Sequence, residues 1–202
     1  MEQFIRTKTG VNFRTGPGTS NSVLKYLPAG TELQIIADAE GTWYYAKELT
    51  GNALGYVTSL TQYVVFFKPT WLQQAEKVIA WIEDKMYNGN RPYVYGSTRF
   101  EESSFDCSDL MQHSFRDAAG VVLSSNTRDQ TRNGVKVNLA DIRTGDLILT
   151  DTNRDGVVNH VGVYVHPGKM LHTANPKDNI CYVDFKPGSY QYERIYDIRR
   201  VL

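Results

Sequence analysis

The sequence predicts an α+β protein, in which a small β-barrel precedes a domain of helices packed on an antiparallel sheet. Turn residues divide residues 1–62 into short strands at intervals of about eight to twelve residues, which is typical of a small barrel. Two helical patterns of apolar residues follow, and strand patterns separated by turns occupy the remainder. We therefore expect a barrel domain at 1–65, a linker at 66–72 and a second domain at 73–202.

The composition is that of an ordinary globular protein. The 202 residues are 41% hydrophobic and 22% charged, and the formal net charge is zero. Because no basic surface is indicated, we expect no nucleic-acid partner. No apolar run approaches the roughly 20 residues that cross a membrane, and the first residues lack the layout of a signal peptide. We expect no membrane partner, a monomer, and a cytoplasmic protein unless lysis or another route releases it.

The first domain is expected to consist of short strands with turns between them. The segment Tyr63–Pro69 either completes the barrel or forms an apolar linker. Aromatic side chains of the strands are expected in the barrel core or at its rim, among them Trp43, Tyr45 and Tyr56. The expected strands are Val11–Arg14, Val23–Leu27, Glu32–Ala37, Trp43–Lys47 and Gly55–Val57.

This domain resembles the bacterial SH3 family (SH3b). The resemblance is carried by Val11–Gly18, Leu27–Thr31, Gly41–Tyr45 and Gly55–Val57, which together form most of the domain. The resemblance implies a module that binds the bacterial cell wall or shapes the substrate site, and not a catalytic domain.

The first predicted helix covers residues 71–87, with Thr70 as its N-cap. Its apolar residues recur at helical spacing on one face, and charged residues occupy the other. We expect this helix to pack against the core and to carry no chemistry. Its apolar stripe is Trp71, Leu72, Ala75, Val78, Ile79, Ile82 and Met86.

The second predicted helix begins at Cys107, with Asp106 as its N-cap. The free amides and the dipole at a helix N-terminus favour an anion, so we expect a lowered thiol pKa and a candidate nucleophile. The alternative is a small buried apolar residue, because free cysteine is among the most buried residue types. The only other cysteine, Cys181, lies in a dissimilar context, and we expect both thiols to be free.

A thiol nucleophile needs a base, and the base needs an orienting group. Of the four histidines, His113 is expected to point away from Cys107, and His166 to face solvent beside a turn. His160 and His172 flank that turn on neighbouring strands, and whether they share a face depends on register. We assign His160 as the base and His172 as the orienting group. Either histidine alone is also consistent with an ordinary core or surface residue.

The predicted strand 160–165 has two distinct faces. Val161 and Val163 are expected to face the core, and His160, Gly162 and Tyr164 the opposite side. A glycine beside the histidine is expected to leave room for a substrate backbone.

Residues 73–202 resemble the NlpC/P60 cysteine peptidases, a papain-like α+β family. The matching segments are Pro92–Gly96, Phe105–Leu110, Arg128–Gln130, Gly145–Leu147, His160–Tyr164 and Leu171–Ala174, in the family's order. Two departures are Asp109, where the family usually has glycine, and Gly96-Ser97, where the family often has a Gly-Gly pair.

The resemblance implies a peptidoglycan hydrolase acting on stem peptides, typically between γ-D-glutamate and L-lysine or diaminopimelate. It implies that Cys107 attacks, that His160 takes its proton and that His172 holds the imidazole. The Cys107 amide and the Tyr93 hydroxyl are the implied oxyanion donors, and Asp106 and Ser108 are the implied lining of the stem-peptide pocket. Two alternatives remain: a wall-binding protein with an inactive peptidase domain, or an amidase of the cross-bridge or another acyl hydrolase on the same fold.

No cofactor or metal is expected. Asp151, Asn153 and Asp155 copy the first half of a calcium loop, but Gly162 occupies the position of the required glutamate. We interpret the segment as a turn between strands. Zinc bound by Cys107, His160 and His172 is chemically conceivable, but no fourth ligand clusters with them.

Overall fold

The computed structural model describes residues 2–88, 92–96 and 104–202, which form two compact units, Met1–Pro69 and Thr70–Leu202. The expected linker 66–72 is shared between a strand and a helix in the structure. Strand β7 (Val64–Phe67) ends two residues before helix α1 (Thr70–Asn88) begins. Only Lys68 and Pro69 lie between them.

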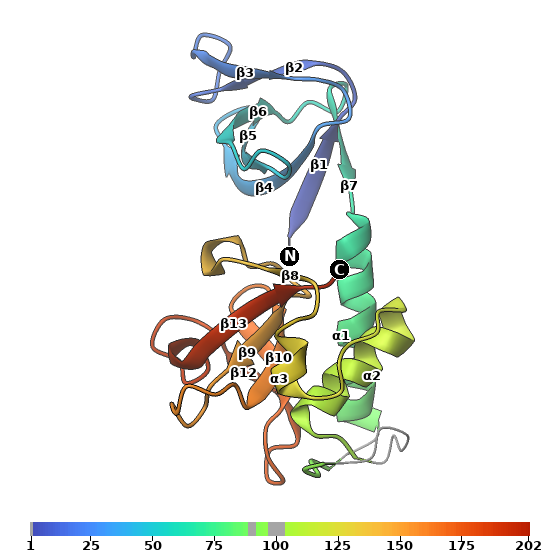
Figure 1. Cartoon of the computed structure of the whole chain (residues 1–202). Coiled ribbons are helices and arrows are strands. Elements are labelled where there is room, and N and C mark those ends of the chain that lie inside the picture. The colour runs from blue at the N-terminus through green and yellow to red at the C-terminus, as the bar shows by residue number, and fades with distance from the viewer. Residues whose placement is uncertain (1, 89–91, 97–103) are drawn as a thin grey trace. The chain divides into compact units, whose positions relative to one another are not determined.

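The first unit is a strongly curved antiparallel sheet of seven strands in the order β3-β2-β6-β5-β4-β1-β7 (Figure 1). All five expected strands are present, and β7 pairs with an unpredicted first strand, β1, so Tyr63–Pro69 adds a strand to the sheet. Its core consists of Ile5, Val11, Phe13, Leu27, Leu33, Ala46, Val57 and Val64. The strands are β1 (Gln3–Thr7), β2 (Val11–Arg14), β3 (Val23–Leu27), β4 (Glu32–Ala39), β5 (Trp43–Glu48) and β6 (Leu54–Thr58).

The strand aromatics of this unit lie at the edge of its core. Trp43, Tyr45 and Tyr56 are all half-buried, and the rings of the two tyrosines are 5.0 Å apart. They therefore belong to the rim, which is one of the two expected positions.

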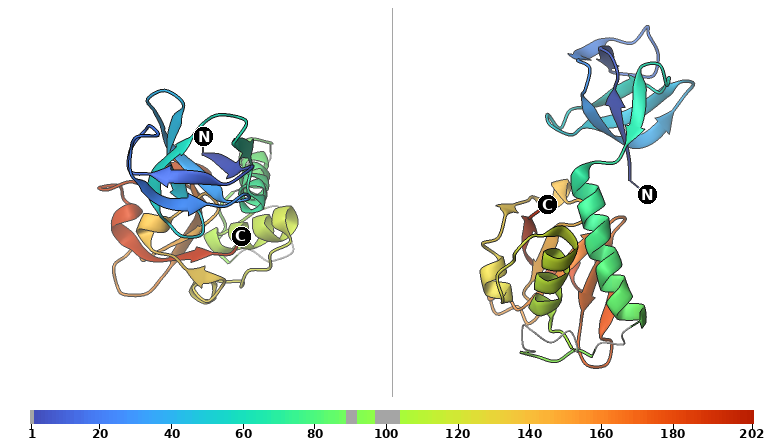
Figure 2. Two further views of the ribbon diagram at one scale, coloured as in Figure 1. Left: turned by 90° about the horizontal axis from the view of Figure 1, so that it is seen from above. Right: turned by 90° about the vertical axis from the view of Figure 1, so that its right-hand side faces the viewer.

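The second unit is an antiparallel sheet of six strands in the order β12-β11-β10-β9-β13-β8. Helices α1 and α2 (Cys107–Ala119) run side by side over one face of this sheet (Figures 1 and 2). A short helix, α3 (Thr127–Gln130), follows α2. The strands are β8 (Val135–Lys136), β9 (Leu147–Thr150), β10 (His160–Val165), β11 (Lys169–Thr173), β12 (Ile180–Asp184) and β13 (Ile195–Arg200).

Two apolar clusters bury the two faces of this sheet. The helix face packs Val161 and Val163 of β10 against the apolar stripes of α1 and α2, as the sequence predicts. On the other face Tyr164 packs with Ile148, Met170 and Phe185. Burying an aliphatic or aromatic side chain contributes about 1.5–3 kcal/mol, so both clusters hold β10 firmly in the centre of the sheet.

The turn into β9 is held by a buried ion pair. Asp146 is 1% exposed, and its carboxylate accepts hydrogen bonds from Arg200 at 2.7 and 2.9 Å and from the Arg143 amide at 2.9 Å. These three hydrogen bonds provide the partners that a buried carboxylate requires. The Gly145–Leu147 motif therefore has a structural role in fixing the start of β9.

Among the helices of the described residues, none has the length and apolar content needed to cross a membrane.

Candidate active site

Asp106 caps helix α2, as the sequence predicts. Its Oδ1 atom accepts the Asp109 amide and the Ser108 hydroxyl, each at 2.9 Å. Capping satisfies one of the free amides at a helix start, and the extended backbone of Asp106 (φ −90°, ψ 178°) is typical of this position. The cap fixes the first turn of the helix, in which Cys107 and Ser108 both lie.

Cys107 is buried, with 7% of its surface exposed, at the first position of α2. Its Sγ atom lies 3.7 Å from the Thr127 hydroxyl. Burial raises the pKa of the Cys107 thiol, and the Asp106 carboxylate raises it further, whereas Thr127 and the backbone of Val161 and Ser108 lower it. The expectation of a lowered thiol pKa is wrong for this structure, because desolvation outweighs the amides of the helix N-terminus.

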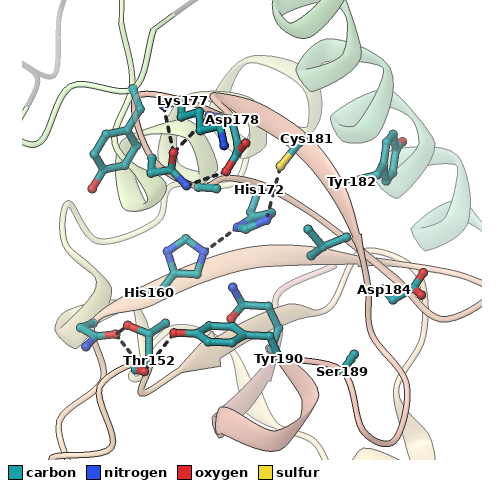
Figure 3. Close-up of a pocket in the computed structure, with 16 residues that line it drawn as sticks. Thr152, His160, His172, Lys177, Asp178, Cys181, Tyr182, Asp184, Ser189 and Tyr190 are labelled. Atoms are coloured by element: carbon teal, nitrogen blue, oxygen red, sulfur yellow. Dashed lines mark hydrogen bonds between the residues drawn. The ribbon is translucent and has the colours of Figure 1, made fainter.

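His160 and His172 meet on one face of the sheet. Val163 pairs with Leu171, and extending this register by one residue places Gly162 opposite His172. His160 is therefore the diagonal neighbour of His172 on the same face. His160 Nε2 and His172 Nδ1 are 2.6 Å apart, and Figure 3 shows the two rings pointing toward one another.

Gly162 makes this meeting possible. A Cβ atom on it would lie 2.6 Å from Met170 Cε, 2.8 Å from His172 Cβ and 2.8 Å from the Leu171 carbonyl oxygen. The space beside Gly162 is thus filled by β11, and the expectation that it receives a substrate backbone is wrong. The missing side chain instead lets β11 approach closely enough for its histidine to reach His160.

Both imidazoles are uncharged near neutral pH. Burial lowers the pKa of His160 to about 3, and the neighbouring His172 adds to this. Burial also lowers the pKa of His172 to about 4, against the opposing effect of the Asp178 carboxylate. At pH 7 each ring therefore carries one proton, and the 2.6 Å bond is between a donor and an acceptor nitrogen.

The histidine pair lines a pocket of about 1040 Å³ (Figure 3). Tyr93 also lines it, whereas Cys107, Asp106 and Ser108 are not among its lining residues. The Cys107 sulfur instead lies beside β10, where the backbone of Val161, the residue after His160, lowers the pKa of the thiol. The other lining residues are Thr152, Asn159, Ala174, Asn175, Lys177, Asp178, Cys181, Tyr182, Val183, Asp184, Ser189, Tyr190 and Gln191.

Tyr93 lies close to the cysteine. Its backbone amide donates to Asn179 Oδ1 at 3.0 Å, which ties the 92–96 segment to the loop before β12. Burial raises the pKa of the Tyr93 hydroxyl, and the nearby Cys107 and Asp106 groups raise it further. The hydroxyl therefore stays protonated and able to donate.

The sequence analysis did not assign three residues to this site. Thr127 contacts the Cys107 sulfur, Asn179 anchors Tyr93, and Cys181 lies beside His172, with Sγ 3.7 Å from Nε2. Asn126 and Asp129 form a capping pattern that signals the start of α3, but nothing in the sequence links this helix to Cys107.

The other two histidines have different surroundings. His113 is buried against the edge of Phe105, with Nε2 3.7 Å from the Asp109 carboxylate and Nδ1 3.0 Å from Arg116. It is not among the residues that line the pocket. His166 is exposed beside the turn that follows β10. Asp109, at the family's usual glycine position, is therefore a buried partner of His113.

The calcium-like segment forms the turn between β9 and β10. Asp151 accepts the amides of Asp155 and Gly156, and Asp155 accepts the amide of Val157. These carboxylates stabilise the turn through its own backbone. Within the part of the chain that the structure describes, no three histidine, cysteine or acidic residues cluster as metal ligands.

Two family profiles match the sequence. The NlpC/P60 family matches residues 90–200, and the bacterial SH3 domain matches residues 9–64. A "Probable endopeptidase" of Haemophilus influenzae is 34% identical over 110 residues, covering 54% of this chain and 66% of that protein. The "Murein DD-endopeptidase MepS/Murein LD-carboxypeptidase" of Escherichia coli is 32% identical over 116 residues, covering 57% and 58%.

A third relative, the "Gamma-D-glutamyl-L-lysine dipeptidyl-peptidase" of Bacillus subtilis, is 33% identical over 103 residues, covering 50% of this chain and 34% of that protein. The matches thus span from one third to just under two thirds of these relatives. Among solved structures, an NlpC/P60 family protein of Bacillus cereus superposes over 100% of this chain and 64% of that chain, with a TM-score of 0.55 and 22% identity. This likeness shows a shared fold.

Proposed function

The chain belongs to the NlpC/P60 family, and we propose that it is a cysteine endopeptidase of peptidoglycan that cleaves the bond between γ-D-glutamate and an L-diamino acid. The observation that carries the proposal is the His160–His172 hydrogen bond of 2.6 Å on the pocket wall, with Cys107 packed behind the adjoining residue Val161. The names of the murein and γ-D-glutamyl relatives support the substrate class.

The proposed first step is attack by the Cys107 sulfur on the peptide carbonyl. Since His160 Nε2 is bonded to His172, its Nδ1 atom is the one that takes the thiol proton. The C–S bond forms, and the carbonyl electrons move to oxygen. The Cys107 amide and the Tyr93 hydroxyl are the proposed donors to this oxyanion.

The second half of the reaction returns the enzyme to its starting state. Collapse of the intermediate breaks the C–N bond, and the amine of the diamino acid leaves with the proton that His160 carried. A water molecule then gives a proton to His160 and attacks the thioester carbonyl. The C–S bond breaks, and the leaving sulfur takes the proton back from His160. The products are a free D-glutamyl carboxyl group and a free amine.

The resting state proposed for this site is a neutral thiol beside a neutral imidazole. Burial raises the pKa of Cys107 and lowers that of His160, so both shifts oppose a standing thiolate–imidazolium pair. The proton is therefore transferred as the substrate is attacked.

The first unit is proposed to bind the cell wall. It contains a groove of about 520 Å³, whose lining includes Arg14, Trp43 and Tyr63. An aromatic and a guanidinium group together suit a peptide or sugar fragment of the wall. Sedimentation with purified sacculi tests this: Trp43→Ala is expected to lower the bound fraction without changing hydrolysis of a soluble peptide.

The decisive experiment is product analysis with a defined tripeptide, L-Ala-γ-D-Glu-L-Lys, offered with a free and with a blocked N-terminus. Mass spectrometry is expected to show release of free lysine from at least one of them, and no release by Cys107→Ala. Equal products from the parent and Cys107→Ala would refute the proposal. Wall binding without any product would instead identify a binding protein with an inactive peptidase domain.

A further inference from the structure

Cys181 is the third residue in a row of interacting side chains, in which Cys181 contacts His172 and His172 contacts His160. In the register of β11 and β12 it lies directly opposite His172, so both side chains are on the same face of the sheet. Its Sγ atom is 3.7 Å from His172 Nε2, the nitrogen that His160 leaves free. Figure 3 shows His172 between His160 and Cys181, with a hydrogen bond on each side.

The two rings have only two possible proton arrangements. Both are neutral near pH 7, so each carries a single proton, and one proton must lie between His160 Nε2 and His172 Nδ1. If His160 donates, its Nδ1 atom has a free lone pair, and the proton of His172 is on Nε2. If His172 donates, the proton of His160 is on Nδ1, and His160 cannot act as a base there.

The two arrangements make opposite demands on the sulfur of Cys181. In the first, His172 Nε2–H points at Sγ and needs an acceptor; in the second, Nε2 is bare and needs a donor. A thiol fills either role weakly. The Asp178 carboxylate lies close enough to raise the pKa of both His172 and Cys181, and a negative charge at this end favours a proton on the nearest ring nitrogen.

We propose that Cys181 is a positioning residue of the catalytic site: by accepting a hydrogen bond from His172 Nε2–H, it fixes His172, and through it His160, in the tautomers that catalysis requires. This rests on the proposed function for its consequence on rate, but the tautomers themselves are a property of the folded protein. Cys181 does not touch the reacting atoms. Its effect is on the population of the competent form of the base.

The test compares Cys181→Ala, which removes the acceptor, with Cys181→Ser, which keeps one. In protein labelled with ¹⁵N-histidine, long-range ¹H–¹⁵N spectra are expected to show Nε2–H for both rings in the parent and in Cys181→Ser. Cys181→Ala is expected to show a mixture at His172. With the tripeptide, kcat of Cys181→Ala should fall about twofold or more, in proportion to the fraction of molecules whose wrong tautomer removes the base, while KM stays unchanged.

A second readout needs no substrate. Both variants contain a single thiol, so the rate of their reaction with iodoacetamide reports on Cys107 alone. The serine variant is expected to react faster than the alanine variant over the neutral range. An Nδ1–H tautomer of His172 in the parent, or an alanine variant that matches the parent in tautomer and kcat, would overturn the proposal. If the parent cleaves no peptide, the proposed function fails, and the tautomer spectra still decide the role of Cys181.

Discussion

His160 and His172 are joined by a hydrogen bond of 2.6 Å although they lie on different strands and are both almost fully buried. Two buried, uncharged imidazoles are costly to protonate, because each new charge would be poorly hydrated. This relationship makes the stability of the second unit dependent on pH.

We expect the free energy of unfolding of the second unit to fall as the pH drops from about 6.5 toward 4. The folded pKa values are about 3 and about 4, below the ordinary value of 6.5, so the unfolded chain binds more protons in this window. Each histidine adds a slope of up to about 1.4 kcal/mol per pH unit, and stability is greatest above pH 6.5.

Urea unfolding of Trp43→Phe provides the measurement, because this variant keeps its remaining tryptophans, Trp71 and Trp81, in the second unit. His172→Asn in the same background is the control and is expected to have a shallower pH slope. Identical slopes for the two proteins would show that His172 titrates normally.

When both effects are expressed as free energies, Gly162→Ala is expected to raise the activation barrier, measured through kcat, by more than it lowers the free energy of unfolding. The added methyl group would lie 2.8 Å from His172 Cβ and must displace that residue from His160. Val163→Ala is the matched control on the same strand, since it faces the helices and should cost about 1–3 kcal/mol of stability with kcat retained. Activity of Gly162→Ala equal to that of the parent would mean that the histidine pair tolerates the shift.

Thr127→Val is expected to slow the reaction of Cys107 with iodoacetamide at a given pH. The Thr127 hydroxyl, 3.7 Å from Sγ, lowers the pKa of the thiol, and valine has the same shape without that hydroxyl. The pH profile of the Cys107 reaction should move upward in Thr127→Val and stay in place in Thr127→Ser. A profile unchanged in both variants would exclude Thr127 from the stabilisation of the thiolate.

Asp146→Ala is expected to destabilise the second unit by about 3–5 kcal/mol, because it leaves the Arg200 guanidinium without its buried partner. Asp184→Ala provides the contrast, since its ion pairs with Lys169 and Lys186 are exposed and should contribute far less. Thermal unfolding of both variants measures the difference. Equal losses would contradict the assignment of Asp146 as a structural residue.

Local features of the fold could be predicted well from the sequence. Strands Val11–Arg14 and Val23–Leu27 have the expected bounds, and Asp106 caps its helix, because turns and caps depend on residues close in the chain. Strand β1 (Gln3–Thr7) was missed, since three of its five residues are polar and its pairing partners lie far along the chain.

The site could be predicted as a set of residues but not as a geometry. The pairing of His160 with His172 depends on strand register, which the loop between them does not specify. The direction of the Cys107 pKa shift depends on burial in the apolar cluster, to which α1, β9 and β10 contribute residues far along the chain. The assignment of Cys107, His160 and His172 as a catalytic triad stays a prediction until products are measured.

The uncharged histidine pair has a consequence for what the pocket can discriminate. The two imidazoles carry no charge at neutral pH, so the carboxylates and ammonium groups of a ligand meet charged side chains of the pocket at Lys177, Asp178 and Asp184. Ionic groups of a ligand are thus met by side chains other than the two imidazoles. Exchanging Lys177 or Asp184 can therefore retune which fragments are retained or released, whereas exchanging Asp178, which raises the pKa of His172, also acts on the histidine pair.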